Sequence, residues 1–297
     1  MSSATADLNA PNSPATPNGG SLKRFVLQPF YDVAGITIYC GDMREIVPML
    51  GNVDAVVTDP PYGETCLEWD KWPDGWLALL VDKTPQVWCF GSMRMFWDKA
   101  ADFRDWRLAQ DVVWEKHNGS GLQNDRFRRV HENAVHLYRG DWASLYKCPP
   151  IVAVKEQRHG LKLKRTAKPQ HFGGIEAGSG YEYDGNRIMR SVIPVNSCHG
   201  YAEHPTQKPE GIIRPLIEYS VPVGGIVLDP FMGSGTTLRV AKDLGRRAIG
   251  IEANETYCRI AVARLAQDVL GLENAELCSA SEASASAIGS ESNRKTK

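Results

Sequence analysis

The sequence predicts an α/β fold in which helices cover both faces of a doubly wound, mostly parallel β-sheet with one inserted region. Short apolar runs rich in β-branched residues alternate with helical patterns along most of the 297 residues. Runs dominated by β-branched residues, such as residues 53–58, are typical of strands buried on both faces. Residues 141–201 break this alternation, because they are rich in Lys, Gly and Pro, and are therefore predicted to be inserted into the core.

The individual elements follow from these patterns in chain order. Apolar runs predict strands at residues 36–39, 53–58, 86–90, 111–114, 134–138, 225–228 and 247–251. Helical periodicity predicts helices at residues 43–50, 75–81, 209–220, 234–244 and 254–270. Both ends are biased toward small and polar residues, which cannot build a packed core. The chain is thus expected to divide into a disordered tail, a first core half, the insertion, a second core half and another disordered tail, at residues 1–21, 22–140, 141–201, 202–272 and 273–297.

The composition is that of a globular protein without a membrane span. Hydrophobic residues make up 42% of the chain, which is enough to bury a substantial core. No run of 18 apolar residues and no signal-peptide pattern occurs, so we expect a cytoplasmic protein. The seven cysteines show no Cys-x-x-Cys spacing, which argues against a disulfide framework and against a metal site.

Positive charge is concentrated in one segment, although the formal net charge is only −1. Residues 115–170 hold twelve Lys/Arg against five Asp/Glu, a local excess of seven positive charges. A solvated charged surface is the ordinary interpretation of such a segment. Contact with a nucleic-acid backbone is the functional alternative.

A glycine-rich turn follows the predicted strand at 225–228 and contains Gly233, Ser234 and Gly235. Glycines at such a turn let a ligand approach the backbone closely at the carboxyl end of a strand. Glu252 ends the strand at 247–251 and could accept both hydroxyls of a ribose. Dinucleotides and S-adenosylmethionine both fit this pattern. Asp229 favours the second, because its charge would repel a pyrophosphate but could accept from an ammonium group.

The tetrapeptide Asp59-Pro60-Pro61-Tyr62 ends the predicted strand at 53–58. A simple tight turn is one interpretation. Methylation of an aromatic amino group is the other, because the delocalised lone pair makes such a nitrogen a poor nucleophile that needs hydrogen-bond acceptors. Asp59 offers a carboxylate and Pro60 a carbonyl held rigid by Pro61. Tyr62 could stack on a base that has left the duplex.

With these motifs the chain resembles the β-group of amino-methylating DNA methyltransferases, the adenine-N6 and cytosine-N4 enzymes. The resemblance covers about residues 37–266, with the catalytic motif ahead of the cofactor motif and an insertion between them. Further matches are Gly41-Asp42, Trp69-Asp70-Lys71-Trp72, Arg126-Phe127-x-x-x-His131-Glu132 and His204-Pro205-Thr206-Gln207-Lys208-Pro209. The resemblance implies a Rossmann-like S-adenosylmethionine-dependent methyltransferase fold with an inserted target-recognition region.

The resemblance also implies roles for individual residues. Catalysis would belong to Asp59, Pro60, Pro61 and Tyr62 in the first core half. S-adenosyl-L-methionine would be bound by Asp42, Thr206, Gln207, Lys208, Asp229, Pro230, Phe231, Gly233, Ser234, Gly235, Thr236 and Glu252. Within this set Asp42 would meet the cofactor adenine, although it could equally cap the helix at 43–50. Thr206, Gln207 and Lys208 would lie near the methionine carboxylate.

Double-stranded DNA is the partner that the resemblance implies. DNA would be contacted by Arg126, Arg128, Arg129, Lys162, Lys164 and Arg165, whether through phosphates or through bases. Asp59 favours adenine over cytosine as the target, with cytosine-N4 methylation as the alternative. The resemblance further implies a homodimer, and a cognate restriction endonuclease is a conceivable partner. From other classes, a dinucleotide-dependent oxidoreductase or a non-catalytic DNA-binding module would leave part of these motifs unexplained.

Overall fold

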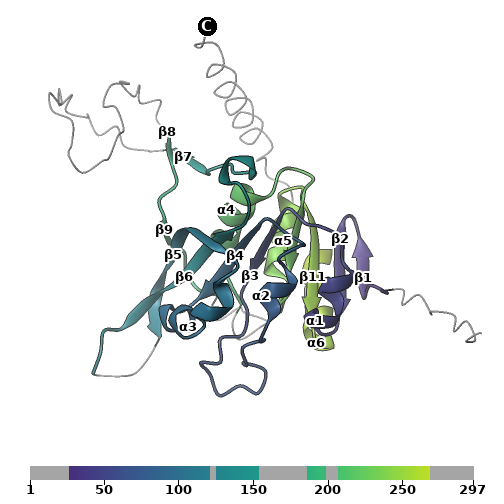
Figure 1. The fold of residues 1–297 in the computed structure, drawn as a ribbon, viewed down its shortest axis with the longest axis horizontal. Helices are drawn as coiled ribbons and strands as arrows, with labels where there is room; N and C mark the ends of the chain where they lie inside the picture. The colour runs from purple at the N-terminus through teal and green to yellow at the C-terminus, as the bar shows by residue number, and fades with distance from the viewer. Residues whose placement is uncertain (1–26, 121–124, 154–185, 199–206, 268–297) are drawn as a thin grey trace, which may run out of the picture.

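The computed structural model describes residues 27–120, 125–153, 186–198 and 207–267. Its centre is a nine-stranded sheet in the order β1-β2-β11-β10-β3-β4-β6-β5-β9 (Figure 1). The strands are β1 (Tyr31–Val33), β2 (Ile36–Cys40), β3 (Ala55–Thr58), β4 (Gln86–Gly91), β5 (Arg107–Ser120), β6 (Arg129–Tyr138), β9 (Val192–Pro194), β10 (Ile226–Asp229) and β11 (Arg247–Glu252). A separate two-stranded sheet pairs β7 (Ile151–Ala153) with β8 (Asn186–Ile188).

The parallel part of the sheet places two strand ends side by side at a topological switch point. Strands β2, β11, β10, β3 and β4 run parallel. The chain continues from β3 to β4 on one side, and from β10 to β11 on the other. The connections that follow β3 and β10 therefore diverge, which opens the sheet edge where α/β proteins bind their ligands.

Helices cover both faces of this sheet, as a doubly wound fold requires. One face packs against α4 (Glu210–Ser220), α5 (Thr236–Asp243) and α6 (Glu255–Ala266). The other packs against α1 (Met43–Ile46), η1 (Val47–Met49), α2 (Trp76–Leu79), α3 (Met93–Asp98) and η2 (Ala100–Phe103). Val56 and Val57 are consecutive residues of β3 that belong to opposite cores, because successive side chains of a strand point to opposite faces. The fold class predicted from the sequence is confirmed.

Every strand and helix predicted within the described residues is present, with shifted ends. The predicted helix at 43–50 ends early, as α1 followed by the 3₁₀ turn η1, which carries Pro48 near its start. The predicted strand at 111–114 is the centre of the much longer β5. Strands β1, β7, β8 and β9, helix α3 and the short turn η3 (Trp142–Ser144) were not predicted.

The ends of the chain and much of the predicted insertion lie outside the described residues. Within the range 141–201, β9 joins the main sheet beside β5, whereas β7 and β8 pair with each other. The boundaries of the insertion therefore remain a prediction. Among the described residues, no helix is long and apolar enough to span a membrane.

Truncation of a core side chain tests the packing of α5 on the sheet. Leu238 is fully buried, so Leu238→Ala should lower the free energy of unfolding by about 2–5 kcal/mol in urea denaturation. The matched control is Leu108→Ala on β5, where the side chain is 66% exposed and the loss should be within about 0.5 kcal/mol. Equal losses in the two variants would contradict the assigned packing.

Candidate active site

The two sequence motifs meet where β3 and β10 end. Asp59 follows β3 directly and Asp229 is the last residue of β10. The Thr58 hydroxyl donates a hydrogen bond of 2.7 Å to Oδ1 of Asp229, which connects the two strands. The motifs line one cleft of about 1340 Å³. The structure thus brings together segments that are 170 residues apart in the sequence.

Backbone geometry shapes the wall of the cleft that belongs to the second core half. Gly233 and Gly235 have φ angles of +51° and +79°, which side-chain-bearing residues rarely adopt. A Cβ on Gly235 would lie 2.8 Å from the Cβ of Ala261, so glycine also permits the close approach of α6. The carboxylate of Glu252 accepts from the backbone N–H of Gly233 at 3.1 Å and of Asn254 at 2.8 Å. Turn and acid are therefore positioned as one unit.

Four charged side chains form a cluster around Asp59, which we call the Asp59 cluster: Asp59, Lys116, Glu132 and Lys208. The Lys208 ammonium donates to Oδ2 of Asp59, and the Tyr62 hydroxyl donates to Oδ1. Lys208 Nζ also lies 3.4 Å from Oε2 of Glu132. The other oxygen of Glu132, Oε1, lies 3.1 Å from Nζ of Lys116. Positive and negative groups therefore alternate through this part of the cleft.

Burial and pairing act in opposite directions on the pKa values of this cluster. Burial raises the pKa of Asp59, although the nearby Lys208 partly offsets the rise. Burial alone would lower the pKa of Lys208, but Asp59 and Glu132 outweigh it and raise that pKa. Burial would raise the pKa of Glu132, but Lys208 and Lys116 hold it below its usual value. Burial also raises the pKa of Tyr62 well above its usual value, so Tyr62 is a neutral donor.

Asp229 is the most deeply buried carboxyl group of the cofactor motif. Burial raises its pKa to about 6, against the opposing effect of hydrogen bonds from Thr58, Thr237 and the N–H of Phe231. It is therefore mostly ionised at neutral pH, at an energetic cost to the folded state that a cationic ligand would reduce.

The loop that follows the catalytic motif is held by a second aspartate. Asp70 accepts from the backbone N–H of Gly63 at 2.8 Å and of Thr65 at 2.7 Å. Burial would raise the pKa of Asp70, but these hydrogen bonds outweigh it and lower that pKa. Trp72 donates from its indole nitrogen to Asp102 at 2.6 Å. The Trp69-Asp70-Lys71-Trp72 segment thus fixes the loop beside Tyr62.

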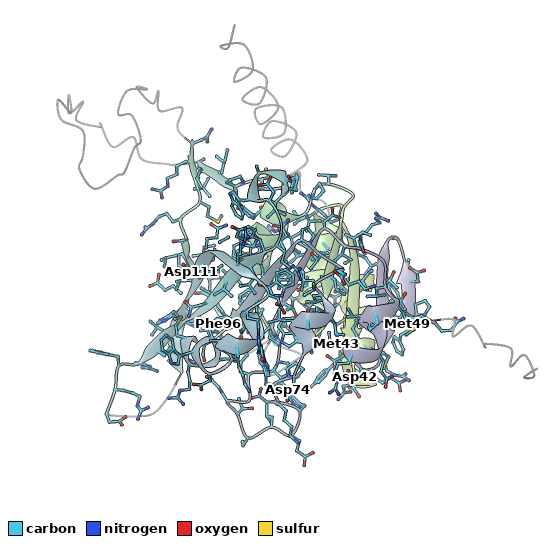
Figure 2. All side chains as sticks on the ribbon, in the orientation of Figure 1. Asp42, Met43, Met49, Asp74, Phe96 and Asp111 are labelled. Atoms are coloured by element: carbon cyan, nitrogen blue, oxygen red, sulfur yellow. The ribbon has the colours of Figure 1, made fainter. Side chains whose placement is uncertain are left out.

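Most of the residues predicted for the site line the cleft. These are Asp42, Asp59, Pro60, Pro61, Tyr62, Gln207, Lys208, Asp229, Pro230, Phe231, Gly233, Ser234, Thr236 and Glu252. Gly235 is not among the residues that line the cleft; it lies just before α5 and packs closely against Ala261 of α6. Asp42 also caps α1 by accepting from the N–H of Arg44 at 2.8 Å, so its interpretation as a helix cap is confirmed. Asp42 and Asp74 lie at the lower end of the molecule in Figure 2, where the loops leave the sheet. Thr206 lies outside the described residues.

The predicted DNA-contacting residues divide into three groups. Arg126 and Arg128 are exposed beside β6, at the end of the β5–β6 hairpin. Arg129 lines the cleft, with Nη2 3.8 Å from Glu64. Lys162, Lys164 and Arg165 lie outside the described residues.

Sequence reasoning missed part of the Asp59 cluster. Glu132 ends a matched motif but received no role, because a glutamate in a strand gives no sign of what faces it across the sheet. Lys116 was counted only as part of the basic segment. Lys116 and Glu132 come together through the pairing of β5 with β6, and only the folded structure shows that Lys208 lies beside them.

Comparison with known proteins now identifies the family. The family model for DNA methylases of the N6 and N4 type matches residues 53–263. The chain belongs to the N6/N4 DNA methylase family. The resemblance seen in the sequence motifs is therefore confirmed, and the chain is an amino-methylating DNA methyltransferase. A dinucleotide-dependent oxidoreductase is inconsistent with this assignment.

Individual relatives agree with the family. The chain is 26% identical over 291 residues to the type II methyltransferase M.ScaI of Streptomyces caespitosus, which covers 84% of this chain and 88% of that protein. It is 28% identical over 262 residues to the type II methyltransferase M.HinfI of Haemophilus influenzae, over 77% of this chain and 68% of that protein.

Solved structures show the same architecture. The crystal structure of the M1.HpyAVI-SAM complex has a TM-score of 0.54 at 26% identity, over 77% of this chain and 98% of that chain. The cytosine-N4-specific PvuII DNA methyltransferase has a TM-score of 0.56 over 86% of this chain and 93% of that chain. At 14% identity, this second likeness shows the fold alone.

S-adenosylmethionine is the cofactor of the family, and the donor set of the cleft fits it. Glu252 presents a carboxylate at the end of β11, and Asp229 adds a buried carboxylate that suits a cationic group. Gly233 and Gly235, which have positive φ angles and no side chains, let a ligand approach the backbone of the turn closely.

Two aspartates of the site should respond to pH in opposite directions. The pKa of Asp229 is about 6 in the folded protein against about 4 in an unfolded chain, so the folded state binds the proton more tightly. The contribution of Asp229 to the free energy of unfolding should therefore fall by on the order of 2–3 kcal/mol as the pH rises from 4 to 7. Asp229→Asn cannot ionise and should lose less stability than the wild type over this range.

Asp70→Asn is the matched control. The lowered pKa of Asp70 contributes stability that is present above its unfolded pKa and is lost as the pH falls through the folded pKa. Because the folded pKa of Asp70 lies below 3.8, the cost of this substitution should be largest at pH 7, slightly smaller at pH 4, and should fall mainly below pH 4. Urea unfolding of the wild type and both variants between about pH 2 and pH 7 measures this. Parallel pH profiles for Asp229→Asn and the wild type would contradict the assigned burial of Asp229.

Proposed function

We propose that the chain methylates the N6-amino group of adenine at specific sites in double-stranded DNA, with S-adenosylmethionine as the methyl donor. The supporting observation is that Asp59, at the end of β3, lines the same cleft as Asp229 and Glu252, at the ends of β10 and β11. An amino group directed at Asp59 would also meet the carbonyl of Pro60, so both of its hydrogens find acceptors. The proposal therefore rests on a carboxylate beside a cofactor motif.

The residues of the first core half orient the amino group. Asp59 and the Pro60 carbonyl accept its hydrogens and favour a tetrahedral nitrogen with an available lone pair. Tyr62 provides a ring on which the base can stack. When bound, S-adenosylmethionine supplies an electrophilic methyl group, and direct transfer needs no covalent intermediate with the protein.

The second core half would hold the cofactor. Glu252 would accept from the ribose hydroxyls and Asp229 from the ammonium of the methionine moiety. The remaining contacts would come from Asp42, Gln207, Pro230, Phe231, Gly233, Ser234, Gly235 and Thr236, with Thr206 by resemblance. The resemblance places Lys208 near the methionine carboxylate. In the structure its ammonium group also pairs with the carboxylates of Asp59 and Glu132.

A target base would have to leave the DNA helix to reach this site. The side chain of Asp59 is only 21% exposed, so a base stacked in a duplex cannot reach it. At about 1340 Å³ the cleft exceeds the roughly 300–1,000 Å³ of a typical ligand pocket. It therefore has room for a flipped base beside the cofactor.

The β5–β6 hairpin would contact the DNA backbone through Arg126, Arg128 and Arg129. Strand β6 extends past the end of β4, because Gly91, the last residue of β4, pairs with Asn133, and Arg129 in this extension lines the cleft. Lys162, Lys164 and Arg165 would add to this surface. A homodimer and a cognate restriction endonuclease as partner are part of the proposal by resemblance only.

The choice of adenine over cytosine rests on Asp59 in the catalytic motif. Incubation with unmethylated DNA and S-adenosylmethionine, followed by digestion and mass spectrometry of the nucleosides, should yield N6-methyladenine. Formation of N4-methylcytosine without N6-methyladenine would replace the proposal with cytosine-N4 methylation.

Removal of the catalytic carboxylate should abolish transfer but leave cofactor binding intact. Asp59→Ala is expected to lower kcat by at least about 10²-fold, because the amino group loses its charged acceptor. Calorimetry should show wild-type affinity for S-adenosylmethionine. Retention of methyl transfer by this variant, measured with labelled methyl groups, would show that Asp59 has no catalytic role.

Neutralisation of the hairpin arginines should weaken DNA binding in a salt-dependent way. For the double variant Arg126→Ala/Arg128→Ala, the slope of log affinity against log salt should become shallower by about 0.9 for each phosphate that the protein no longer neutralises. Fluorescence anisotropy with a DNA duplex over a salt series measures the slope. Arg107→Ala, at the opposite end of β5, is the matched control and should keep the wild-type slope. An unchanged slope in the double variant would remove the hairpin from the DNA interface.

A further inference from the structure

The Asp59 cluster raises a question about access to the catalytic carboxylate. Lys208 donates to one oxygen of Asp59 and Tyr62 donates to the other. An amino group that approaches Asp59 must therefore compete with donors already in place. Release of the Lys208 ammonium into a buried site without another partner would cost several kcal/mol.

Glu132 offers Lys208 that other partner. Its Oε2 lies 3.4 Å from Lys208 Nζ and is buried without a hydrogen bond of its own among the described residues. A normal N–H···O distance is about 2.9 Å, so a movement of a few tenths of an ångström would complete a hydrogen bond. The Lys208 side chain is only 9% exposed, which excludes water as an easy substitute.

Glu132 is itself held in place from the other side. Its Oε1 lies 3.1 Å from Nζ of Lys116, and this ammonium lies 4.5 Å from the ring centroid of Trp114. Trp114 and Glu132 are direct partners across the β5–β6 ladder. Two paired strands therefore hold the carboxylate of Glu132, whereas Lys208 lies just before α4, outside any helix or strand.

We propose that Glu132 is a positioning residue that shares Lys208 with Asp59, so that the ammonium shifts from Asp59 to Glu132 when the target amino group arrives. This inference rests on the proposed catalytic role of Asp59. With two carboxylates and two ammonium groups the cluster is neutral before and after the shift, so the exchange leaves no net charge in the buried site. Lys208 favours the ionised form of Asp59 while no DNA is bound. Glu132 offers the Lys208 ammonium a second carboxylate, so that Lys208 can leave Asp59.

Glu132→Gln tests the inference because it keeps the shape of the side chain and removes its charge. Among the described residues, Lys208 then has Asp59 as its only anionic partner, so kcat should fall about 10- to 100-fold. The negative charge of Glu132 raises the pKa of Asp59, so its removal should also move the acid limb of the pH profile of kcat/KM to lower pH. A loss of structure alone would not move that limb.

Three further variants complete the experiment. Glu132→Asp keeps the charge and should restore the acid limb and most of kcat. Lys116→Met/Glu132→Gln leaves no unpaired lysine in the cluster, and should shift the limb as Glu132→Gln does even where the single variant folds poorly. Glu218→Gln neutralises a half-buried glutamate on α4 that does not line the cleft, and should match the wild type.

The outcomes separate this inference from the proposed function. A lower kcat together with a shifted acid limb, rescued by Glu132→Asp, supports it. A wild-type profile for Glu132→Gln, or a fall in kcat without a shift, overturns it while Asp59→Ala remains inactive. Full activity of Asp59→Ala would instead overturn the catalytic role of Asp59, and the inference with it.

Discussion

The hydrogen bond from Thr58 to Asp229 connects the two halves of the active site. Thr58 is the last residue of β3, and Asp229 is the last residue of β10, which lies beside it. Because the connections after these strands diverge, the edge of the sheet opens at this junction, and the residue after each strand lines the same cleft. The positions of Asp59 and of the cofactor turn relative to each other are thus set by the sheet and not by flexible loops.

Much of this arrangement could be predicted from the sequence, because its signals are local. The buried run at residues 53–58, the Gly233–Gly235 turn and the acid at 252 each report their own structure through hydrophobic pattern and backbone requirements. The family motifs then gave the order of the two halves. Helix α3, short and preceded by Ser92 as its cap, lacked a long periodic pattern and was missed.

The remainder could not be predicted, because it depends on pairing between distant segments. Strand β5 carries polar residues along most of its length, and its pairing with β6 defines it better than any apolar run. Lys116 and Glu132 face each other only through this pairing, and Lys208 reaches them from another part of the chain. A charged residue in the sequence indicates a solvated surface by default, and only its burial shows otherwise.

The charge of the cleft explains why it suits a sulfonium cofactor better than a pyrophosphate. Among the described residues, its lining holds seven carboxylates against five cationic side chains: Asp42, Asp59, Glu64, Asp70, Glu132, Asp229 and Glu252 against Arg44, Lys71, Lys116, Arg129 and Lys208. Burial raises the pKa of Asp59, Asp229 and Glu252, so the ionised form of each carries an energetic cost. A ligand with a positive sulfur and an ammonium group lowers this cost, whereas two phosphates would increase it. Because Lys208 is buried as well, its ammonium group needs an anionic partner at all times. Its position between the carboxylates of Asp59 and Glu132 meets that requirement.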